Sequence, residues 1–284
     1  MIIVDFSGIA IAPIAQKYVA VDDVDLFRHM VLNSLRMYRQ KFKKYGELVI
    51  VADGGGNWRK DVYPEYKGKR KTNRDASPID WSTAWETITT VLDELKENMP
   101  YKIIHQWGCE ADDAIAELVM HTQTFGNWED VMIVSSDHDF IQLQKYDNVK
   151  QFSTVTKKMV KNDNPRLYQA EHFIRGCSGD GVPNCLSDDD ALINPDKRQT
   201  VLSAKKKAAL LDDPKALGED VYRNYQRNVA MINLTENTKC PENVRNEIIN
   251  TFEKYDTPDK SKVFPYLVAK NCRRLLEDVM EFIN

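Results

Sequence analysis

Acidic side chains lie at the ends of four short apolar segments, and their type and spacing could do chemistry. The segments Ile2–Phe6, Glu47–Ala52, Tyr101–Gln106 and Val131–Ser136 are rich in Ile and Val, as buried strands are. The acidic residues at or just after their ends are Asp5, Asp53, Glu110, Asp112, Asp113, Asp137 and Asp139, and a later loop adds Asp180. Because ligands bind at the carboxyl ends of parallel strands, we expect these carboxylates to converge on one site.

A single acidic residue at such a place usually caps a helix or closes a turn. Many together repel, since unit charges ~4 Å apart at an effective dielectric of ~20 interact by about 4 kcal/mol. Divalent cations relieve this repulsion, and an all-oxygen set selects Mg²⁺ or Mn²⁺ over zinc. Two such ions about 3.5–4 Å apart can hold a phosphodiester and activate water. The carboxylates therefore predict two-metal phosphodiester hydrolysis.

A basic segment with interleaved aromatic rings lies between residues 59 and 74. Its net charge is +5, against −9 for the remainder and −4 for the whole chain. Such a strip on an acidic body is typical of a polyanion site, although a solvated surface face has the same composition. The rings favour nucleic acid because they can stack on bases. The residues expected to contact it are Arg59, Lys60, Tyr63, Tyr66, Lys67, Lys69 and Arg70.

Helical patterns separate the predicted strands. We expect helices over Val24–Lys44, Ile79–Asn98 and Glu110–His121, with Ser77 and Pro78 as the start signal of the second, and a weaker hairpin over Val149–Val160. This alternation predicts an α/β fold with a mostly parallel central sheet flanked by helices.

The pattern changes to helices and polar loops from about residue 162. The expected helices are Tyr168–Arg175, Ser187–Ile193, Gln199–Leu211, Asp220–Ile232, Asn243–Lys254 and Pro265–Ile283. The simplest division is an α/β domain over residues 1–160 and a helical domain over 161–284.

The composition excludes several other classes of protein. Of the 284 residues, 42% are apolar and 29% charged, which is typical of a soluble globular chain. The longest apolar run, Ile9–Ala15, is too short to cross a membrane, and the N-terminus has no secretory-signal pattern. Five scattered cysteines without a CxxC pair predict reduced thiols in a cytoplasm. The triplet Gly54–Gly56 lacks the Lys-Ser/Thr of a phosphate-binding loop and predicts a flexible exit after Asp53.

Six motifs in order carry a family resemblance. They are Ile-Val-Asp-Phe-Ser at 3–7, Val-Ala-Asp-Gly at 51–54, Tyr-Pro-Glu-Tyr-Lys-Gly-Lys-Arg at 63–70, Glu-Ala-Asp-Asp at 110–113, Ser-Ser-Asp-His-Asp-Phe at 135–140 and Gly-Cys-Ser-Gly-Asp-Gly-Val-Pro-Asn at 176–184. Any one is weak, but the ordered set is specific. The chain resembles the 5′-nuclease (flap endonuclease) superfamily with its PIN-like fold, and within it the ribonuclease H group of T-even-type bacteriophages.

The resemblance implies roles for matching positions. Asp53, Glu110 and Asp112 would hold a first Mg²⁺ with Asp5 nearby, Asp113 would lie close to both ions, and Asp137, Asp139 and Asp180 would hold the second. Lys67 and Arg70 would face the scissile phosphate from a basic helical arch over about residues 57–99, where a cation stabilises charge in the transition state. Tyr66 would stack on the first bases.

The same resemblance implies that residues 161–284 bind DNA. A helix-hairpin-helix-like element is expected from about Tyr168 to Leu211, with a potassium ion at the turn Gly176–Asn184. Phosphate contacts are expected from Lys197, Arg198, Lys205, Lys206 and Lys207.

The implied activity is 5′-to-3′ exonuclease and flap endonuclease cleavage that removes RNA primers and 5′ flaps in phage DNA replication. Expected partners are branched or nicked DNA, RNA–DNA duplexes with a 5′ end, a single-strand-binding protein and a sliding clamp. A monomer in the cytoplasm of a phage-infected bacterium is expected, with Mn²⁺ as a substitute for Mg²⁺.

One departure from the family pattern leaves an alternative open. The turn usually reads Gly-Asp-x-x-Asp, and Cys177 stands at the first Asp. Because a thiol binds magnesium poorly, we expect reduced activity or a shift toward Mn²⁺, and the alternative is an inactive binder of branched DNA. A phosphatase of the haloacid-dehalogenase type is a third hypothesis, because Asp137-His138-Asp139 fits a D-x-D motif. The Glu-Ala-Asp-Asp motif argues against it.

Overall fold

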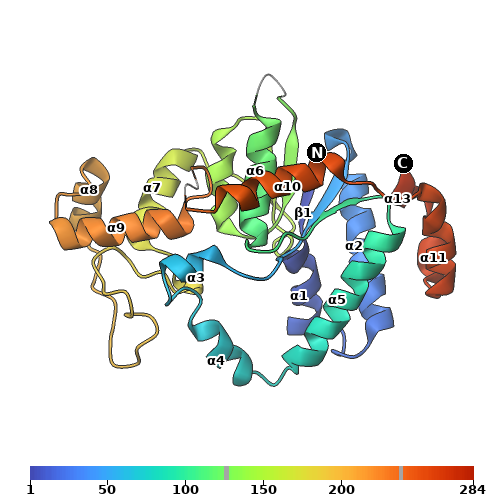
Figure 1. The fold of residues 1–284 in the computed structure, drawn as a ribbon, viewed down its shortest axis with the longest axis horizontal. Coiled ribbons are helices and arrows are strands. Elements are labelled where there is room, and N and C mark those ends of the chain that lie inside the picture. The colour runs from blue at the N-terminus through green and yellow to red at the C-terminus, as the bar shows by residue number, and fades with distance from the viewer. Residues whose placement is uncertain (125–127, 237–238) are drawn as a thin grey trace.

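The computed structural model describes residues 1–124, 128–236 and 239–284, and a six-stranded sheet lies at its centre (Figure 1). The strands are β1 (Ile2–Asp5), β2 (Leu48–Val51), β3 (Lys102–Ile104), β4 (Val131–Val134), β5 (Val149–Phe152) and β6 (Met159–Val160). Their order is β3-β2-β1-β4-β5-β6, and every pair is parallel except β5 with β6. The expected strands are confirmed. The order reverses between β1 and β4, which is the place where open sheets bind ligands.

The strands carry continuous apolar runs because the sheet is covered on both faces. Ile2 and Val4 of β1 pack into the cluster on one face, whereas Ile3 packs into the cluster on the other. All four residues of β2 and of β4 are buried.

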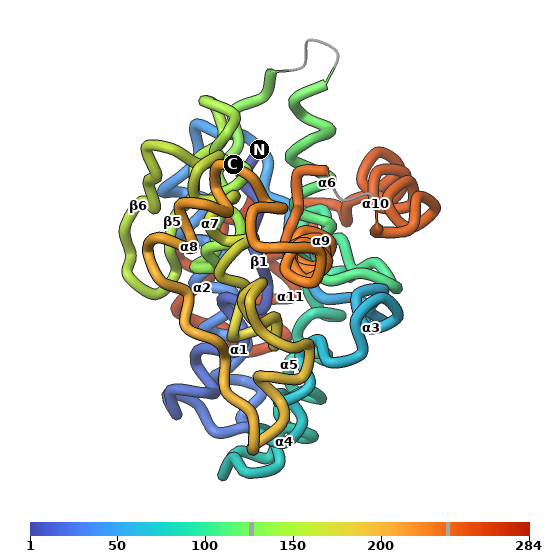
Figure 2. The backbone as a smooth tube through the Cα atoms, turned by 90° about the vertical axis from the view of Figure 1, so that its left-hand side faces the viewer, coloured from blue at the N-terminus to red at the C-terminus, as the bar shows by residue number. Residues whose placement is uncertain are grey.

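Helices form a layer on each face (Figures 1 and 2). One layer contains α1 (Phe6–Ala15), α2 (Val24–Lys41) and α5 (Trp81–Asn98), with the 3-10 helix η1 (Lys43–Tyr45) after α2. The other contains α6 (Ala111–Thr122), α10 (Glu242–Lys254) and the 3-10 helix η2 (His138–Lys145). Two details differ from expectation. The sequence did not indicate α1, and α5 begins at Trp81 with Asp80 rather than Ser77 as its cap.

The second half of the chain contains further helices, of which the one expected from Gln199 begins only at Ala204. They are α7 (Pro165–Arg175), η3 (Ser178–Asp180), α8 (Ala204–Asp212), α9 (Glu219–Ile232), η4 (Lys260–Lys262), α11 (Val263–Ala269), α12 (Arg273–Leu276) and α13 (Met280–Ile283). The helix expected over 187–193 is wrong. There Ser187 Oγ accepts a hydrogen bond from the Thr200 backbone at 2.9 Å, and such local side-chain bonds compete with helix formation. The single helix expected over 265–283 is interrupted at Asn271, whose φ is +53°.

Two short helices form the arch. α3 (Trp58–Val62) and α4 (Lys69–Asp75) connect β2 to α5; α3 lies just below α9 in Figure 1, and α4 lies at the bottom of the view. The expected range of 57–99 is too long. Ala84, Val91 and Leu95 of α5 are fully buried in the core, so the arch ends before Trp81.

The division at residue 160 does not describe the packing. Val263, Leu267 and Phe282 from α11–α13 are buried in the same cluster as α2 and α5. Ile248 of α10 is buried against α6. The tail of the chain therefore completes the α/β body instead of extending the helical part around α7–α9. Within the described ranges, no helix is both long enough and apolar enough to span a membrane.

Candidate metal centre and nucleic-acid interface

Four aspartates gather at the carboxyl end of the sheet, on both sides of the switch point. Asp5 ends β1 and accepts a hydrogen bond from Ser135 Oγ at 2.8 Å, just beyond β4. Asp53 follows β2, and its Oδ1 accepts from the Ala111 backbone at 2.8 Å. The Asp53 carboxylate therefore meets the start of α6, which carries Asp112. Asp137 follows β4 and caps η2.

The ionisation of these carboxylates reflects their crowding. Burial raises the pKa of Asp5 to about 6, and the Asp53 and Asp137 carboxylates add to the rise. Burial also raises the pKa of Asp112 well above its usual range, with Asp137 as the next largest cause. Burial raises the pKa of Asp139 in the same way, and the Asp137 carboxylate is again the next largest cause. Acidic groups that repel one another in a half-buried oxygen-rich site fit divalent cations, whose charge would reverse these shifts.

Glu110 and Asp180 are joined to the base of the arch by charged hydrogen bonds. Lys67 Nζ donates to Glu110 and lies 3.6 Å from Asp180 Oδ1, while Arg70 donates to Asp180 at 2.9 Å. Tyr66 donates to Glu110 at 2.8 Å. Burial alone would raise the pKa of Glu110, but the Lys67 ammonium holds this pKa below its usual value. The structure thus brings Lys67 and Arg70 into contact with the carboxylates of the site.

Asp113 and Arg59 differ from their expected roles. Arg59 is only 2% exposed, and its two terminal nitrogens donate to both oxygens of Asp113 at 2.7 and 2.8 Å. Trp58 Nε1 also donates to Asp113 at 3.1 Å, and Arg59 Nε donates to the Met231 carbonyl. A buried arginine cannot contact nucleic acid, and both oxygens of the Asp113 carboxylate already accept hydrogen bonds from Arg59. The pair instead fixes the arch to α6 and α9.

The two arch tyrosines are also buried, which corrects their assignment as base-stacking residues. Tyr63 is 3% exposed and donates to the Gly181 carbonyl at 3.1 Å and to that of Asp189. Tyr66 is 2% exposed. Both rings pack in a cluster with Trp58 and Phe173. Their sequence pattern reflects a packed joint between the arch and the helical part of the molecule.

The remaining predicted basic residues divide by exposure. Lys60, Lys69, Arg70, Lys205, Lys206 and Arg198 are exposed. Lys207 pairs with Glu171 at 2.9 Å, and Lys197 pairs with Asp188 and Asp190. Exposed cations on α4 and α8 remain the candidates for phosphate contacts.

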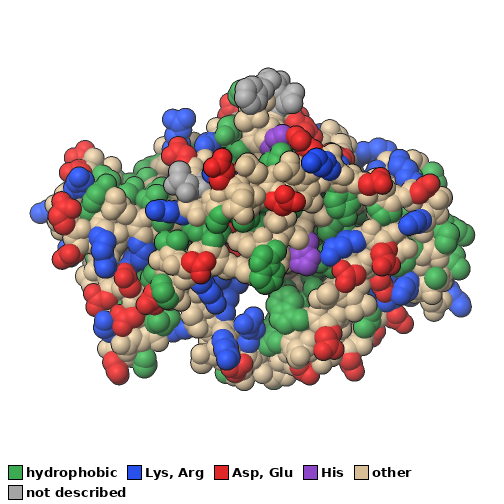
Figure 3. Space-filling model, viewed as in Figure 1, with side chains coloured by type: hydrophobic (Ala, Val, Ile, Leu, Met, Phe, Trp, Pro, Cys, Tyr) green, Lys and Arg blue, Asp and Glu red, His purple; other side chains and the backbone are tan. Residues whose placement is uncertain are grey.

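An opening passes below the centre of the molecule in the space-filling view, with Lys and Arg side chains along its rim (Figure 3). It lies where Figure 1 places the arch between α3 and α5. The exposed basic residues of α4 are Lys69, Arg70, Lys71 and Arg74. The carboxylate edge of the sheet and a basic frame therefore share one side of the molecule.

The turn at residues 176–184 is held in a closed loop. The Cys177 and Val182 backbones exchange two hydrogen bonds of 2.9 Å. Gly176 has φ +72°, and a Cβ there would lie 2.4 Å from the Val182 carbonyl, so glycine is required. The Asn184 side chain accepts a hydrogen bond from the Leu186 backbone and donates one to the Thr200 carbonyl, so both of its polar atoms have partners in the protein.

His172 is a site residue that the sequence did not reveal. Its Nδ1 lies 3.3 Å from Asp139 Oδ1, and the ring is 4% exposed. Burial lowers its pKa to about 4, so the ring is neutral at pH 7. Nothing in its sequence context marks it, because it lies on α7, 33 residues beyond Asp139.

The glycine triplet after Asp53 is tightly packed rather than flexible. A Cβ at Gly54 would lie 1.7 Å from the Gln106 carbonyl oxygen, and one at Gly55 would lie 2.9 Å from the Trp107 ring. Gly108 donates to the Gly55 carbonyl at 2.8 Å. The triplet thus lets the loop after β3 pack onto the loop after β2. This contact fixes Asp53 beside α6.

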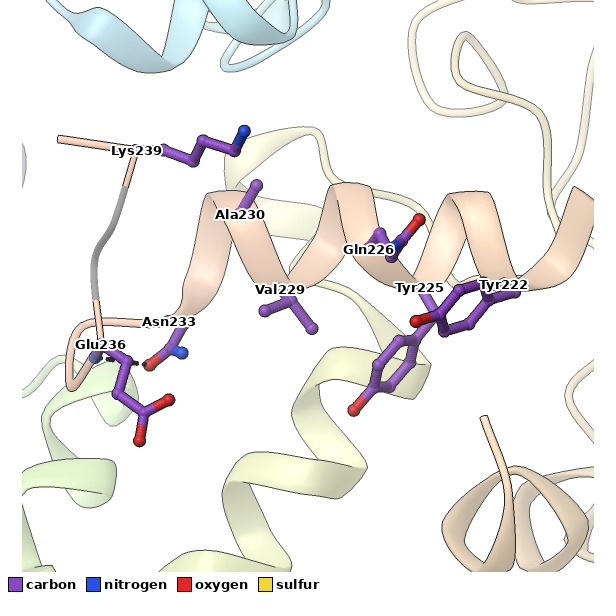
Figure 4. Close-up of a pocket in the computed structure, with 8 residues that line it drawn as sticks. All are labelled: Tyr222, Tyr225, Gln226, Val229, Ala230, Asn233, Glu236 and Lys239. Atoms are coloured by element: carbon purple, nitrogen blue, oxygen red, sulfur yellow. Dashed lines mark hydrogen bonds between the residues drawn. The ribbon is translucent and has the colours of Figure 1, made fainter. Parts of the chain in front are cut away.

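A separate pocket of about 330 Å³ lies along α9 (Figure 4). Tyr222 and Tyr225 stack on one side with their rings 6.4 Å apart, and Asn233 and Glu236 lie at the other end. Among its described lining residues Glu236 is the one carboxylate, so the pocket is not a second candidate for the chemistry.

Fold and site together define a nuclease, and comparison with known proteins gives its family. Residues 15–173 match the family described as 5′-3′ exonuclease, N-terminal resolvase-like domain, and residues 182–282 match the family described as T4 RNase H, C terminal. The chain belongs to the 5′-3′ exonuclease family. Among characterised relatives, ribonuclease H of Enterobacteria phage T4 is 30% identical over 294 residues, covering 99% of this chain and 95% of that protein.

Solved structures share the fold at lower identity. The T5 5′-exonuclease with zinc ions bound has a TM-score of 0.67 and 16% identity, covering 89% of this chain and 98% of that one. The bacteriophage T5 flap endonuclease in complex with DNA and metal ions has a TM-score of 0.63 at 16% identity, covering 89% and 97%. The expected fold and the expected 5′-to-3′ exonuclease function are therefore confirmed, and the inactive-binder alternative is not favoured.

Proposed function

We propose that this nuclease hydrolyses phosphodiesters near 5′ ends with two divalent cations, Mg²⁺ with Mn²⁺ as a substitute. The observation that carries the proposal is the gathering of Asp5, Asp53, Asp112 and Asp137 at the switch point beside the cations of the arch. Divalent cations held there would offset the charge of the phosphodiester and lower the pKa of the attacking water.

The residues divide into two groups. Asp53, Glu110 and Asp112, with Asp5 beside them, would hold one cation, and Asp137, Asp139 and Asp180 would hold the other. Asp113 is omitted because it is bound to Arg59.

Lys67 and Arg70 would orient the scissile phosphate. Lys67 now contacts the carboxylates of Glu110 and Asp180, and Arg70 contacts that of Asp180, so cations bound by these carboxylates would compete with the two side chains. The released ammonium and guanidinium would face the phosphate, where they stabilise negative charge that develops on its oxygens. The left-handed backbone of Lys67, with φ +55°, and its hydrogen bond from N to the Asp180 carbonyl at 2.7 Å hold this residue at the site.

The substrate we propose is a 5′ single strand on branched or nicked DNA, or an RNA primer on DNA. The basic opening beneath the arch favours a strand that enters by its backbone, without base-specific contacts (Figure 3). The exposed lysines of α8 would contact the adjoining duplex, which predicts strong salt dependence. A single-strand-binding protein, a sliding clamp and a potassium ion at residues 176–184 rest on the family resemblance alone.

The test is a cleavage assay with a 5′-labelled flap and a nicked RNA–DNA duplex, each with Mg²⁺ or EDTA. Metal-dependent release of short 5′ products from both supports the proposal. Intact binding without metal-dependent shortening of either substrate would overturn it. Hydrolysis of a small phosphomonoester with the DNA left intact would favour the phosphatase hypothesis instead.

A further inference from the structure

Three side chains with different metal-ligating atoms meet beside the second carboxylate group. One ligand atom each from Asp139, His172 and Cys177 lies within 4.8 Å of the other two. They line a pocket of about 460 Å³ between η2, α7 and the 176–184 turn. A tetrahedral ion with these ligands has edges of about 3.3–3.8 Å, so small side-chain rotations would close the set around one ion.

The backbone holds all three residues in place. Asp139 is fixed by a hydrogen bond from its own N–H to Asp137 Oδ1 at 2.9 Å. His172 lies in the last turn of α7, where its carbonyl accepts from Gly176 at 2.9 Å. Cys177 is fixed by the paired hydrogen bonds with Val182. Three different elements therefore converge, which is the arrangement that ordered metal sites require.

Two other carboxylates near this triad are less well placed to bind the same ion. Asp180 is engaged by Arg70 and Tyr66, whereas Asp137 is exposed at the mouth of the pocket. Arg175 also lines the pocket, and its guanidinium donates to Tyr168 Oη at 3.0 Å. An ion at the centre of the triad would thus have an open side toward the pocket. Three protein ligands with one open position are typical of catalytic zinc sites.

We propose, on the basis of the nuclease function above, that Asp139, His172 and Cys177 form a mixed oxygen, nitrogen and sulfur cation site beside the second carboxylate group, with which it shares Asp139. Imidazole and thiolate ligands select Zn²⁺ or Co²⁺ and bind Mg²⁺ poorly. Cys177 is then itself a metal ligand, in place of the aspartate that the family pattern has at this position. Binding replaces the S–H bond of Cys177 with a metal–sulfur bond, and the proton goes to the buffer.

The test is a titration of the metal-free full chain with Co²⁺, followed by its absorption spectrum. A thiolate-to-cobalt charge-transfer band is expected on binding. Calorimetric titration with Zn²⁺ in two buffers of different ionisation enthalpy should show that binding releases the Cys177 thiol proton, together with any proton held by Asp139, to the buffer. These readouts do not depend on cleavage.

Variants identify the ligands. Cys177→Ala should abolish the charge-transfer band, and His172→Asn should weaken Zn²⁺ binding by about 10-fold or more. Cys272→Ala is the matched control, because Cys272 is a buried thiol in the opposite helix layer. Cys177→Asp should lose the band and gain Mg²⁺ affinity. Should one variant fail to fold, the other still tests the site.

Two outcomes would overturn the site. One is a cobalt spectrum without the charge-transfer band in the unaltered protein, and the other is Zn²⁺ affinity unchanged in both Cys177→Ala and His172→Asn. Cleavage of a flap with Mg²⁺ in a protein that shows either outcome would leave the nuclease function standing and remove only the mixed site. A normal band in a protein that cleaves no substrate with any cation would support the metal site and contradict the nuclease function.

Discussion

At the scale of single residues, the carboxylates of the switch point have a function that conflicts with stability. Asp5 and Asp112 are buried among other acidic groups, and burial together with the neighbouring carboxylates raises the pKa of each. Such groups are typical of functional sites, since packing alone would not select them.

Asp112→Asn should abolish cleavage, lowering the rate by more than about 100-fold, because it removes a metal ligand. Folding and binding of a flap substrate should change little, since the amide keeps the shape of the side chain. Flap cleavage with Mg²⁺ and fluorescence anisotropy with EDTA measure the two effects. Asp75→Asn on the exposed face of the arch is the control. Unchanged turnover in Asp112→Asn would refute its assignment.

Asp5→Asn should stabilise the metal-free protein at neutral pH. The folded pKa of about 6 exceeds the unfolded value near 3.8, so the folded state binds more protons between these values and stability falls as pH rises from about 4 to 6. An amide does not ionise, so Asp5→Asn avoids this loss of stability. The free energy of unfolding at pH 7 should rise by about 1–3 kcal/mol. Urea unfolding with EDTA at pH 4 and pH 7 measures it. Equal stability of the two proteins at both pH values would contradict the assigned shift.

At the scale of elements, the arch is anchored by buried charge. Arg59→Met removes the cation that both oxygens of Asp113 contact, and should lower the free energy of unfolding by about 3–5 kcal/mol. The neighbouring Lys60→Met is the control, because Lys60 is exposed on the same helix. Chemical denaturation compares them. A weakened affinity for DNA with unchanged stability would instead restore Arg59 to the nucleic-acid interface.

The sequence predicted the elements that have clear periodicity and missed those that do not. Strands β1, β2 and β4 are short Ile- and Val-rich runs, and α2, α5 and α6 carry helical spacing. Helix α1 was not predicted, because its residues are apolar on nearly every side, which hides the helical period, and because they include Pro13. Exposure could not be read from the basic segment, so Arg59, Tyr63 and Tyr66 were assigned to the interface although they are buried. His172 required the three-dimensional structure, because only packing of α7 on η2 brings it to Asp139.

At the scale of the whole molecule, residues from both ends of the chain build one core. Phe282 is fully buried with the side chains of α2 and α5, and the Tyr101 hydroxyl donates to its carbonyl at 3.2 Å. Phe282→Ala should therefore lower the free energy of unfolding by about 3–5 kcal/mol although it lies outside the catalytic edge. Met280→Ala, at 56% exposure on the same short helix, should have little effect. Urea unfolding of both variants measures the difference, and equal midpoints would show that the tail adds nothing to the core.

The position of α11–α13 also has a consequence for synthesis on the ribosome. Translation delivers the strands, the acidic residues and α1, α2 and α5 first, but the apolar side chains of α11–α13 that pack against α2 and α5 arrive later. A nascent chain would therefore leave apolar side chains of α2 and α5 uncovered until residues 263–283 emerged, so the core would close only after that segment had been synthesised.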